Sequence, residues 1–419
     1  MSAGAERVET LTGGAELARR ARPPIGVLVI LGALTAIGPF SIDMYLPGLP
    51  ALATSLGASA ASAQQTVAAY FLGIAFGQLL YGPLSDRFGR RGPLLAGTAL
   101  YVAAALGCAL APSVAVLSGL RVLQAIGACA GLVIGRAVVR DRFPPQEVLH
   151  VFALMAVVVS LSPLIAPLVG GWLLLVTGWR ELFLIQAGAG LLLGLAVYLR
   201  LVETRSEATA ARARSESPLA AYAALLTEKR LTVFFLANAC SAAALYVWIA
   251  GSADLVIRTY GFSAQHFGYV FGLNALGLML GAQANARLAR RVRPGVILRN
   301  ATLFAFACAL VLAVASFAGW GGMWGVLGPV FLVVTSMGFT QTNAQAEAIN
   351  VDPRRSGSTS ALLGSIGSFA GAGAAGLAGL FRDGTSRPMA LAIAISLLLG
   401  VLAVTLLKRS SGPESRTAA

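Results

Sequence analysis

The chain has 419 residues, of which 57% are hydrophobic and only 11% charged, with a mean hydropathy of +0.78. Soluble domains are about a quarter charged, so this composition excludes an ordinary soluble protein and indicates an integral membrane protein. The formal net charge of +14 would suit a nucleic-acid-binding protein, and the positions of the basic residues decide whether that class is needed.

In chain order, a short polar tail at 1–24 precedes about twelve apolar segments, each near the roughly 20 residues that cross a bilayer as a helix. The sequence therefore predicts an all-α membrane protein. The expected spans are 25–47, 64–84, 93–111, 114–135, 150–176, 181–200, 231–251, 266–286, 296–316, 320–342, 357–381 and 388–407.

Most of the Lys and Arg residues fall in every second loop between the expected spans. These loops lie on the same side of the membrane as the N-terminus. The positive-inside rule then predicts that both termini are cytoplasmic. This explains the charge without any nucleic-acid partner, and membrane lipid is the expected surrounding.

The first span ends with an isolated carboxylate, Asp43, shortly before Pro47 and Pro50, where we expect the chain to leave the helix. A negative charge in the last turn of a helix opposes the helix dipole. It therefore needs a partner unless it is a carboxylate at the membrane interface in contact with water, an alternative that stays open.

The fourth span contains Arg121, which lies roughly 10 Å below the outer boundary at 1.5 Å per residue. An unpaired arginine at that depth costs several kcal/mol, so it either reaches the interface or faces protein. We expect Asp43 and Arg121 to meet, with Gln124 on the same helical face able to hydrogen-bond either group. In this interpretation Asp43 takes a proton and Arg121 sets its affinity for it.

The polar segment 202–230 separates six spans from six, and we interpret it as a cytoplasmic linker. Residues 77–91 match residues 277–291 at five positions, and both stretches follow the second span of their half. Two such repeats are typical of a secondary transporter. The predicted parts are a tail at 1–24, six-helix bundles at 25–201 and 231–408 around the linker, and a tail at 409–419.

The motifs in these segments resemble the major facilitator superfamily. "GPLSDRFGRRG" at 82–92 is similar to its loop motif after span two, and "RVLQAIGACAG" at 121–131 to its span-four motif. "DMYLPGLP" at 43–50 narrows the resemblance to the bicyclomycin-resistance (Bcr/CflA) branch, together with "FGYVFGLN" at 267–274 and "NAQA" at 343–346.

This resemblance implies a proton-coupled exporter of small hydrophobic antibiotics, such as bicyclomycin- or chloramphenicol-like compounds, in the inner membrane of a bacterium. It implies alternating access controlled by a gating loop, in which Asp86 pairs with Arg90 or caps a helix of the other half, with Asp141 as another possible partner. The loop residues concerned are Gly82, Asp86, Arg87, Gly89, Arg90 and Arg91. A generic cluster of topology-setting arginines is the alternative.

The chain also departs from the family pattern. In span five, Ala166 precedes Pro167 where the family usually has glycine, so the bend and close packing depend on Pro163, Pro167, Gly170 and Gly171. Asp254 and Glu347 are unusual for the branch and receive no role.

The candidate contacts with cargo are polar or aromatic residues within spans, although packing is the commoner role for each of them. These residues are Tyr70, Asn238, Tyr246, Trp248 and Asn274. We also interpret the glycine-rich span 357–381 as a surface for close helix packing.

We expect no cofactor, no metal and a monomer. The four cysteines lie within expected spans without metal-ligand spacing. No lysine follows a glycine as a phosphate-binding loop requires, which argues against ATP. A metabolite exporter on the same fold and, more distantly, a channel stay open. A membrane enzyme is disfavoured because no nucleophile–base cluster is visible.

Overall fold

The computed structural model describes residues 25–215 and 217–410, and within them every regular element is a helix. Twelve helices are long and apolar enough to cross a membrane. They are α2 (Ile25–Asp43), α4 (Ala60–Phe88), α5 (Arg91–Ala109), α6 (Val114–Arg142), α7 (Pro145–Leu173), α8 (Trp179–Arg200), α11 (Lys229–Ala253), α12 (Ala264–Leu288), α13 (Pro294–Ala318), α14 (Gly322–Val351), α15 (Ser356–Leu380) and α16 (Arg387–Ser410).

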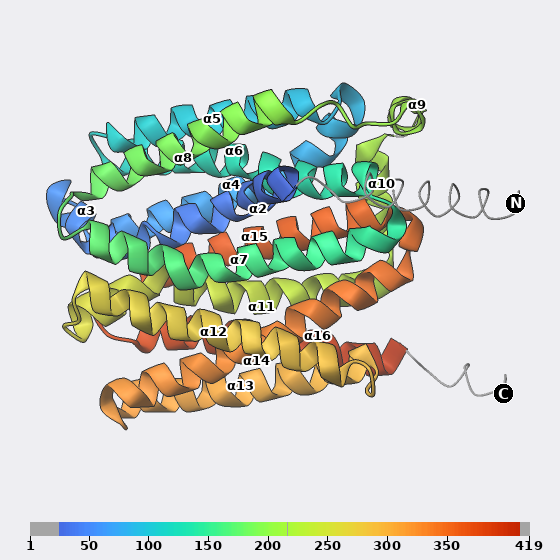
Figure 1. Cartoon of the computed structure of the whole chain (residues 1–419). Coiled ribbons are helices and arrows are strands. Elements are labelled where there is room, and N and C mark those ends of the chain that lie inside the picture. Colours follow the sequence, from blue (N-terminus) through green and yellow to red (C-terminus); the bar gives the residue numbers. More distant parts are fainter. Residues whose placement is uncertain (1–24, 216, 411–419) are drawn as a thin grey trace, which may run out of the picture.

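Each expected span overlaps one of these helices, so the predicted all-α membrane fold with twelve helices is confirmed. Figure 1 shows the helices running side by side, with the short helix α3 (Leu49–Ser55) at one end and α9 (Glu207–Ser215) and α10 (Pro218–Thr227) at the other. We call these the α3 end and the linker end. The predicted tail at 1–24 and residues 411–419 lie outside the described part.

The first helix, α2, stops at Asp43 rather than at residue 47, although the apolar stretch that could span the membrane continues from Gly26 to Ser55. The two prolines begin new turns instead of ending the old one: Pro47 lies in the 3-10 helix η1 (Leu46–Gly48) and Pro50 opens α3. Proline fits the start of a helix because its missing N–H has no partner there in any case.

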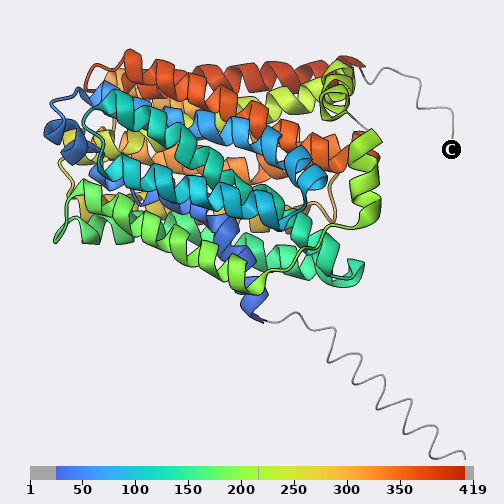
Figure 2. The same cartoon turned by 90° about the horizontal axis from the view of Figure 1, so that it is seen from above.

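The linker is more ordered than its polar composition suggests. Ser206 and Ser217 each accept a backbone N–H as helix caps, from Thr209 at 3.2 Å and Ala220 at 3.5 Å, at the starts of α9 and α10. Figure 2 shows this segment lying along the linker end of the bundle.

The two sets of six helices use the same packing scheme. Gly77 of α4 packs directly on Cys129 of α6, and Gly277 of α12 packs on Thr335 of α14, which are the corresponding helix pairs of the two halves. The glycines of the sequence repeat are therefore positions where helices approach too closely for a side chain. The boundaries of the two bundles stay a prediction.

The halves meet along two seams, α4 with α15 and α7 with α12. A Cβ on Gly171 would lie 2.5 Å from the carbonyl oxygen of Ala264, and one on Gly268 would lie 2.9 Å from the Cα of Leu168. At the α3 end the seams are closed further by η1 and α3, which pack on α12 and on the π-helix η2 (Asp254–Thr259).

Candidate functional site

Arg121 is completely buried in the first half of the chain, inside a cage of aromatic rings. Its guanidinium carbon lies 4.0 Å from the ring centre of Tyr70, 4.8 Å from that of Tyr45 and 5.6 Å from that of Phe183. A desolvated cation gains about 2 kcal/mol from a well-placed ring. Several such rings offset much of the several kcal/mol that burying the charge costs.

Polar groups from three helices complete the cage. Arg121 Nη1 donates to Gln124 Oε1 at 2.7 Å and to the Ser41 carbonyl at 3.5 Å. Gln124 in turn donates to Gln186 Oε1 at 2.8 Å, and Gln186 donates to the Ser41 carbonyl at 3.3 Å. The Nε and Nη2 atoms of Arg121 are buried without any hydrogen-bond acceptor among the described residues. The arginine therefore keeps donors available for another group.

Asp43 lies two residues beyond Ser41 and is also buried, at 4% exposure. The expected contact between Asp43 and Arg121 is not formed: within the described chain no ion pair joins them. The guanidinium lies instead among the rings of its aromatic cage. The structure thus buries the carboxyl group of Asp43 and the guanidinium of Arg121 in the same half without an ion pair between them.

Span five connects this region to the second half. A Cβ on Gly170 would collide with the carbonyl oxygen of Met44, directly after Asp43, while Gly171 packs on Ala264 of α12. Pro163 and Pro167 both lie inside α7. Gly170 and Gly171 thus lie where α7 contacts the Asp43 segment and the opposite half.

The candidate cargo residues separate into two groups. Tyr70 belongs to the Arg121 cage, and Tyr246 stacks on Phe71 of the other half with ring centres 3.8 Å apart. Asn238 donates to the Leu363 carbonyl at 2.9 Å, and Trp248 is buried in the apolar core. Asn274 donates to the Val270 carbonyl at 2.9 Å, but its Oδ1 is buried without a hydrogen-bond donor in the described chain. Of these five residues, Asn274 is the one with a buried polar atom left unpaired in the described chain, and a cargo role for any of them stays a prediction.

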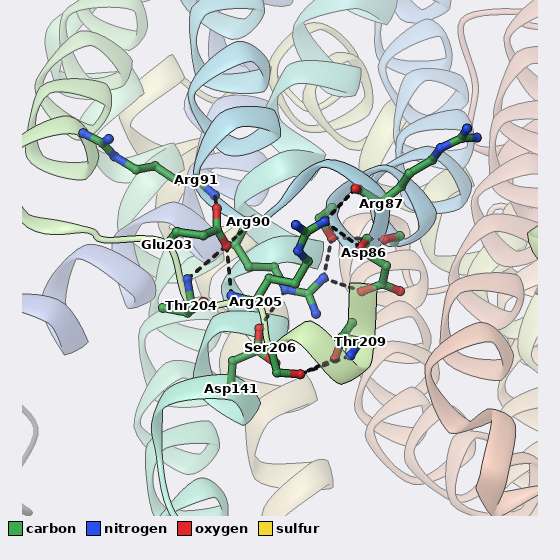
Figure 3. Close-up of polar contacts among 12 residues, drawn as sticks. Asp86, Arg87, Arg90, Arg91, Asp141, Glu203, Thr204, Arg205, Ser206 and Thr209 are labelled. Atoms are coloured by element: carbon green, nitrogen blue, oxygen red, sulfur yellow. Dashed lines mark hydrogen bonds and ion pairs between the residues drawn. The ribbon is translucent and has the colours of Figure 1, made fainter. Parts of the chain in front are cut away.

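The gating loop surrounds a buried arginine. Arg90, only 4% exposed, forms an ion pair with Asp86, and its Nε donates to Asp141 Oδ2 at 2.8 Å (Figure 3). Desolvation lowers the pKa of Arg90, but the two carboxylates outweigh it and raise the pKa. Gly82 lies within α4, and Gly89 takes a positive φ of 96° that favours glycine. The structure thus brings Asp86, Arg90 and Asp141 together.

A third carboxylate, which the sequence did not single out, holds the same loop from the linker. Glu203 accepts the backbone N–H groups of Arg90 at 2.8 Å and Arg91 at 3.1 Å, as well as those of Thr204 and Arg205. The Arg205 side chain donates to the carbonyl of Arg87 at 2.6 Å (Figure 3). We call Glu203 and Arg205 the linker clamp.

We expect Glu203→Gln to weaken this clamp. Partial burial raises the pKa of Glu203, but its four backbone donors outweigh this and keep the pKa below its ordinary value of 4.5. A carboxyl with a depressed pKa stabilises the fold fully above its ordinary pKa and loses that contribution as the pH falls through the folded-state value. Thermal unfolding should therefore occur about 1–2 °C lower in the variant at pH 7.

The same comparison in acid supplies the check. The difference between wild type and Glu203→Gln should shrink as the pH falls below about 4.5. Glu207→Gln, four residues along in the first turn of α9, is the matched control and should unfold like wild type. A difference that is constant between pH 7 and pH 3 would rule out this role for the carboxylate.

Comparison with known proteins agrees with this architecture. The family model described as "Major Facilitator Superfamily" matches residues 31–376. A "Bicyclomycin resistance protein homolog" of Haemophilus influenzae is 27% identical, covering 90% of this chain and 94% of that protein. A "Chloramphenicol resistance protein" of Pseudomonas aeruginosa is 31% identical, covering 82% and 83%. The solved structure of a D-xylose–proton symporter superposes with a TM-score of 0.72 at 14% identity over 91% of this chain and 97% of that one, which shows a shared fold.

Proposed function

The chain belongs to the Major Facilitator Superfamily, and from that premise we propose that it is a drug:H⁺ antiporter that exports small hydrophobic antibiotics by alternating access. The names of its relatives, which include bicyclomycin and chloramphenicol resistance proteins, support an antibiotic as cargo. The chain is a multi-pass membrane protein, and we place it in a bacterial inner membrane as a monomer with both termini in the cytoplasm.

The observation that carries the proton-coupling proposal is the pair of buried, unpaired charges in one half of the protein. Burying a charge without a partner is costly. Gain or loss of one proton at Asp43 would change the local free energy enough to favour a different conformation. In that other conformation the free Nε and Nη2 groups of Arg121 would donate hydrogen bonds to the deprotonated carboxylate, with Gln124 holding the guanidinium in place.

The energy of one proton is sufficient for this work. A proton moving down a potential of 100 mV releases about 2.3 kcal/mol, and about 1.4 kcal/mol corresponds to a factor of ten in concentration. One proton per cycle would thus support roughly a fifty-fold gradient of cargo.

The gating loop is proposed to stabilise one of the two access states. Its buried arginine, Arg90, is held by Asp86 and Asp141. These residues lie at the linker end, where we expect the two halves to move relative to each other during alternating access. Asp86→Asn should then reduce turnover, and an unchanged turnover would remove this role from the proposal.

The test of the proposed function is drug-triggered proton movement in inverted membrane vesicles, followed with a pH-sensitive dye across a panel of hydrophobic antibiotics. We expect at least one compound to collapse a pre-formed gradient in vesicles that contain the protein and to have no effect in vesicles that lack it. If no antibiotic moves protons but an amino acid or small peptide does, the antibiotic assignment is wrong and the metabolite exporter replaces it.

A further inference from the structure

Asp254 is a second buried carboxylate, and the proposed antiport mechanism does not use it. It begins the π-helix η2 directly after α11, is 7% exposed, and lies inside the membrane-spanning stretch Lys229–Thr259.

Two arginines face this carboxylate from different segments. Arg382, in the loop between α15 and α16, forms an ion pair with Asp254, and Arg258 Nε lies 3.9 Å from Asp254 Oδ1. The loop is tied to η2 a second time, because Thr259 Oγ1 donates to the Gly384 carbonyl at 3.2 Å. Asp254 therefore holds η2 and the loop at 381–386 together at the α3 end.

The same cluster reaches the other half of the protein. Arg258 Nη2 donates to the Pro50 carbonyl at 3.3 Å, and Pro50 belongs to the segment that follows Asp43. Gln64 of α4 lies beside Asp254 and lines, with it, two small cavities of about 10 and 20 Å³. Cavities of this size have room for about one water. The α3 end of the interface is thus closed, with Asp254 at the closure.

We propose that Asp254 is a positioning residue of a gate at the α3 end, where its charge holds Arg382 and Arg258 in place and thereby keeps Arg258 on the segment after Asp43. This gate, formed by Asp254, Arg258 and Arg382, is called the α3-end latch. Removing the carboxylate leaves the largely buried Arg382 beside Arg258 without its ion-pair partner, and breaking a buried pair in this way destabilises the arrangement that contains it. The closed arrangement therefore loses free energy relative to one in which Arg382 reaches water.

The inference rests on alternating access from the proposed function, but it is tested without cargo or a proton gradient. Ala63 of α4, 2% exposed, lines the smaller cavity. In a full-length protein whose four native cysteines are replaced by serine, Ala63→Cys reports opening of the α3 end through its reaction with a membrane-impermeant maleimide in proteoliposomes.

We expect Asp254→Asn to accelerate this labelling at least about tenfold, which corresponds to a shift of about 1.4 kcal/mol toward the open state. Asp352→Asn is the matched control, because that carboxylate follows α14 at the linker end and accepts the backbone N–H groups of Arg354 at 3.2 Å and Arg355 at 3.3 Å. The control should label at the rate of the parent protein.

Arg258→Met is a second variant that tests the latch and leaves the Asp254–Arg382 ion pair intact. It is used if Asp254→Asn does not fold. It removes the donor to Pro50 and should also accelerate labelling. Parental labelling rates in folded Asp254→Asn, or in Arg258→Met, would overturn the latch. Accelerated labelling in a protein that moves no protons with any antibiotic would leave the latch standing and refute the drug-export proposal alone.

Discussion

Asp43→Asn should abolish drug-triggered proton movement, by at least about a hundredfold, while leaving the protein as stable as wild type or more so. The carboxylate is buried and forms no ion pair in the described chain. Replacing it by a neutral group of the same shape therefore removes a costly buried charge and breaks no pairing. Activity lost together with stability retained is the pattern of a functional site.

The measurement combines the vesicle proton assay with thermal unfolding of the purified variant. Glu181→Gln, which neutralises a carboxylate in the first turn of α8, is the control and should behave like wild type in both. Proton movement at the wild-type level in Asp43→Asn would exclude Asp43 as the proton carrier. A large fall in its unfolding temperature would show that the side chain has a structural partner.

Arg121→Ala should have the second largest effect, and it should affect both transport and stability. The change removes the cation from its aromatic cage and leaves Gln124 Oε1 without its donor at 2.7 Å. A hydrogen bond to a charged group contributes about 1.5–3 kcal/mol to stability, so the unfolding temperature should fall. Transport should fall by more than about tenfold, because the proposed partner that sets the proton affinity of Asp43 is lost.

Arg121→Lys separates the charge from the geometry. Lysine keeps the positive charge but loses the planar fork that reaches Gln124 and the Ser41 carbonyl together, so we expect intermediate transport. Arg180→Ala is the matched control, because Arg180 also stacks on an aromatic ring, Trp179, at 4.1 Å, but at the α3 end. Equal losses in Arg121→Ala and Arg180→Ala would contradict a special role for the buried cage.

The fold was predictable because membrane spans depend on a local property, the length of an apolar stretch, and each of the twelve stretches is complete in the sequence. The boundaries were less predictable. The helix α2 ends at Asp43, and Pro47 and Pro50 lie in the new helical turns that follow. Composition alone does not distinguish a proline that ends a helix from one that begins the next.

The candidate site was predictable only in part. Asp43, Arg121 and Gln124 stand out because charged or amide side chains are rare in apolar spans. Gln186 carries the same signal, a single amide within an apolar span, and could have been found with it. Tyr45 and Phe183 could not, because an aromatic residue in a span is usually a packing residue and its position over a guanidinium depends on how the helices pack.

The linker clamp has a consequence for how this loop can vary. Glu203 binds the main-chain N–H groups of Arg90 and Arg91, not their side chains. Exchanging either arginine for almost any other residue leaves this contact intact, and proline is the exception because it has no N–H. Related sequences therefore need not show paired substitutions between the linker and the loop, and a search for contacts from covarying positions would pass over this connection.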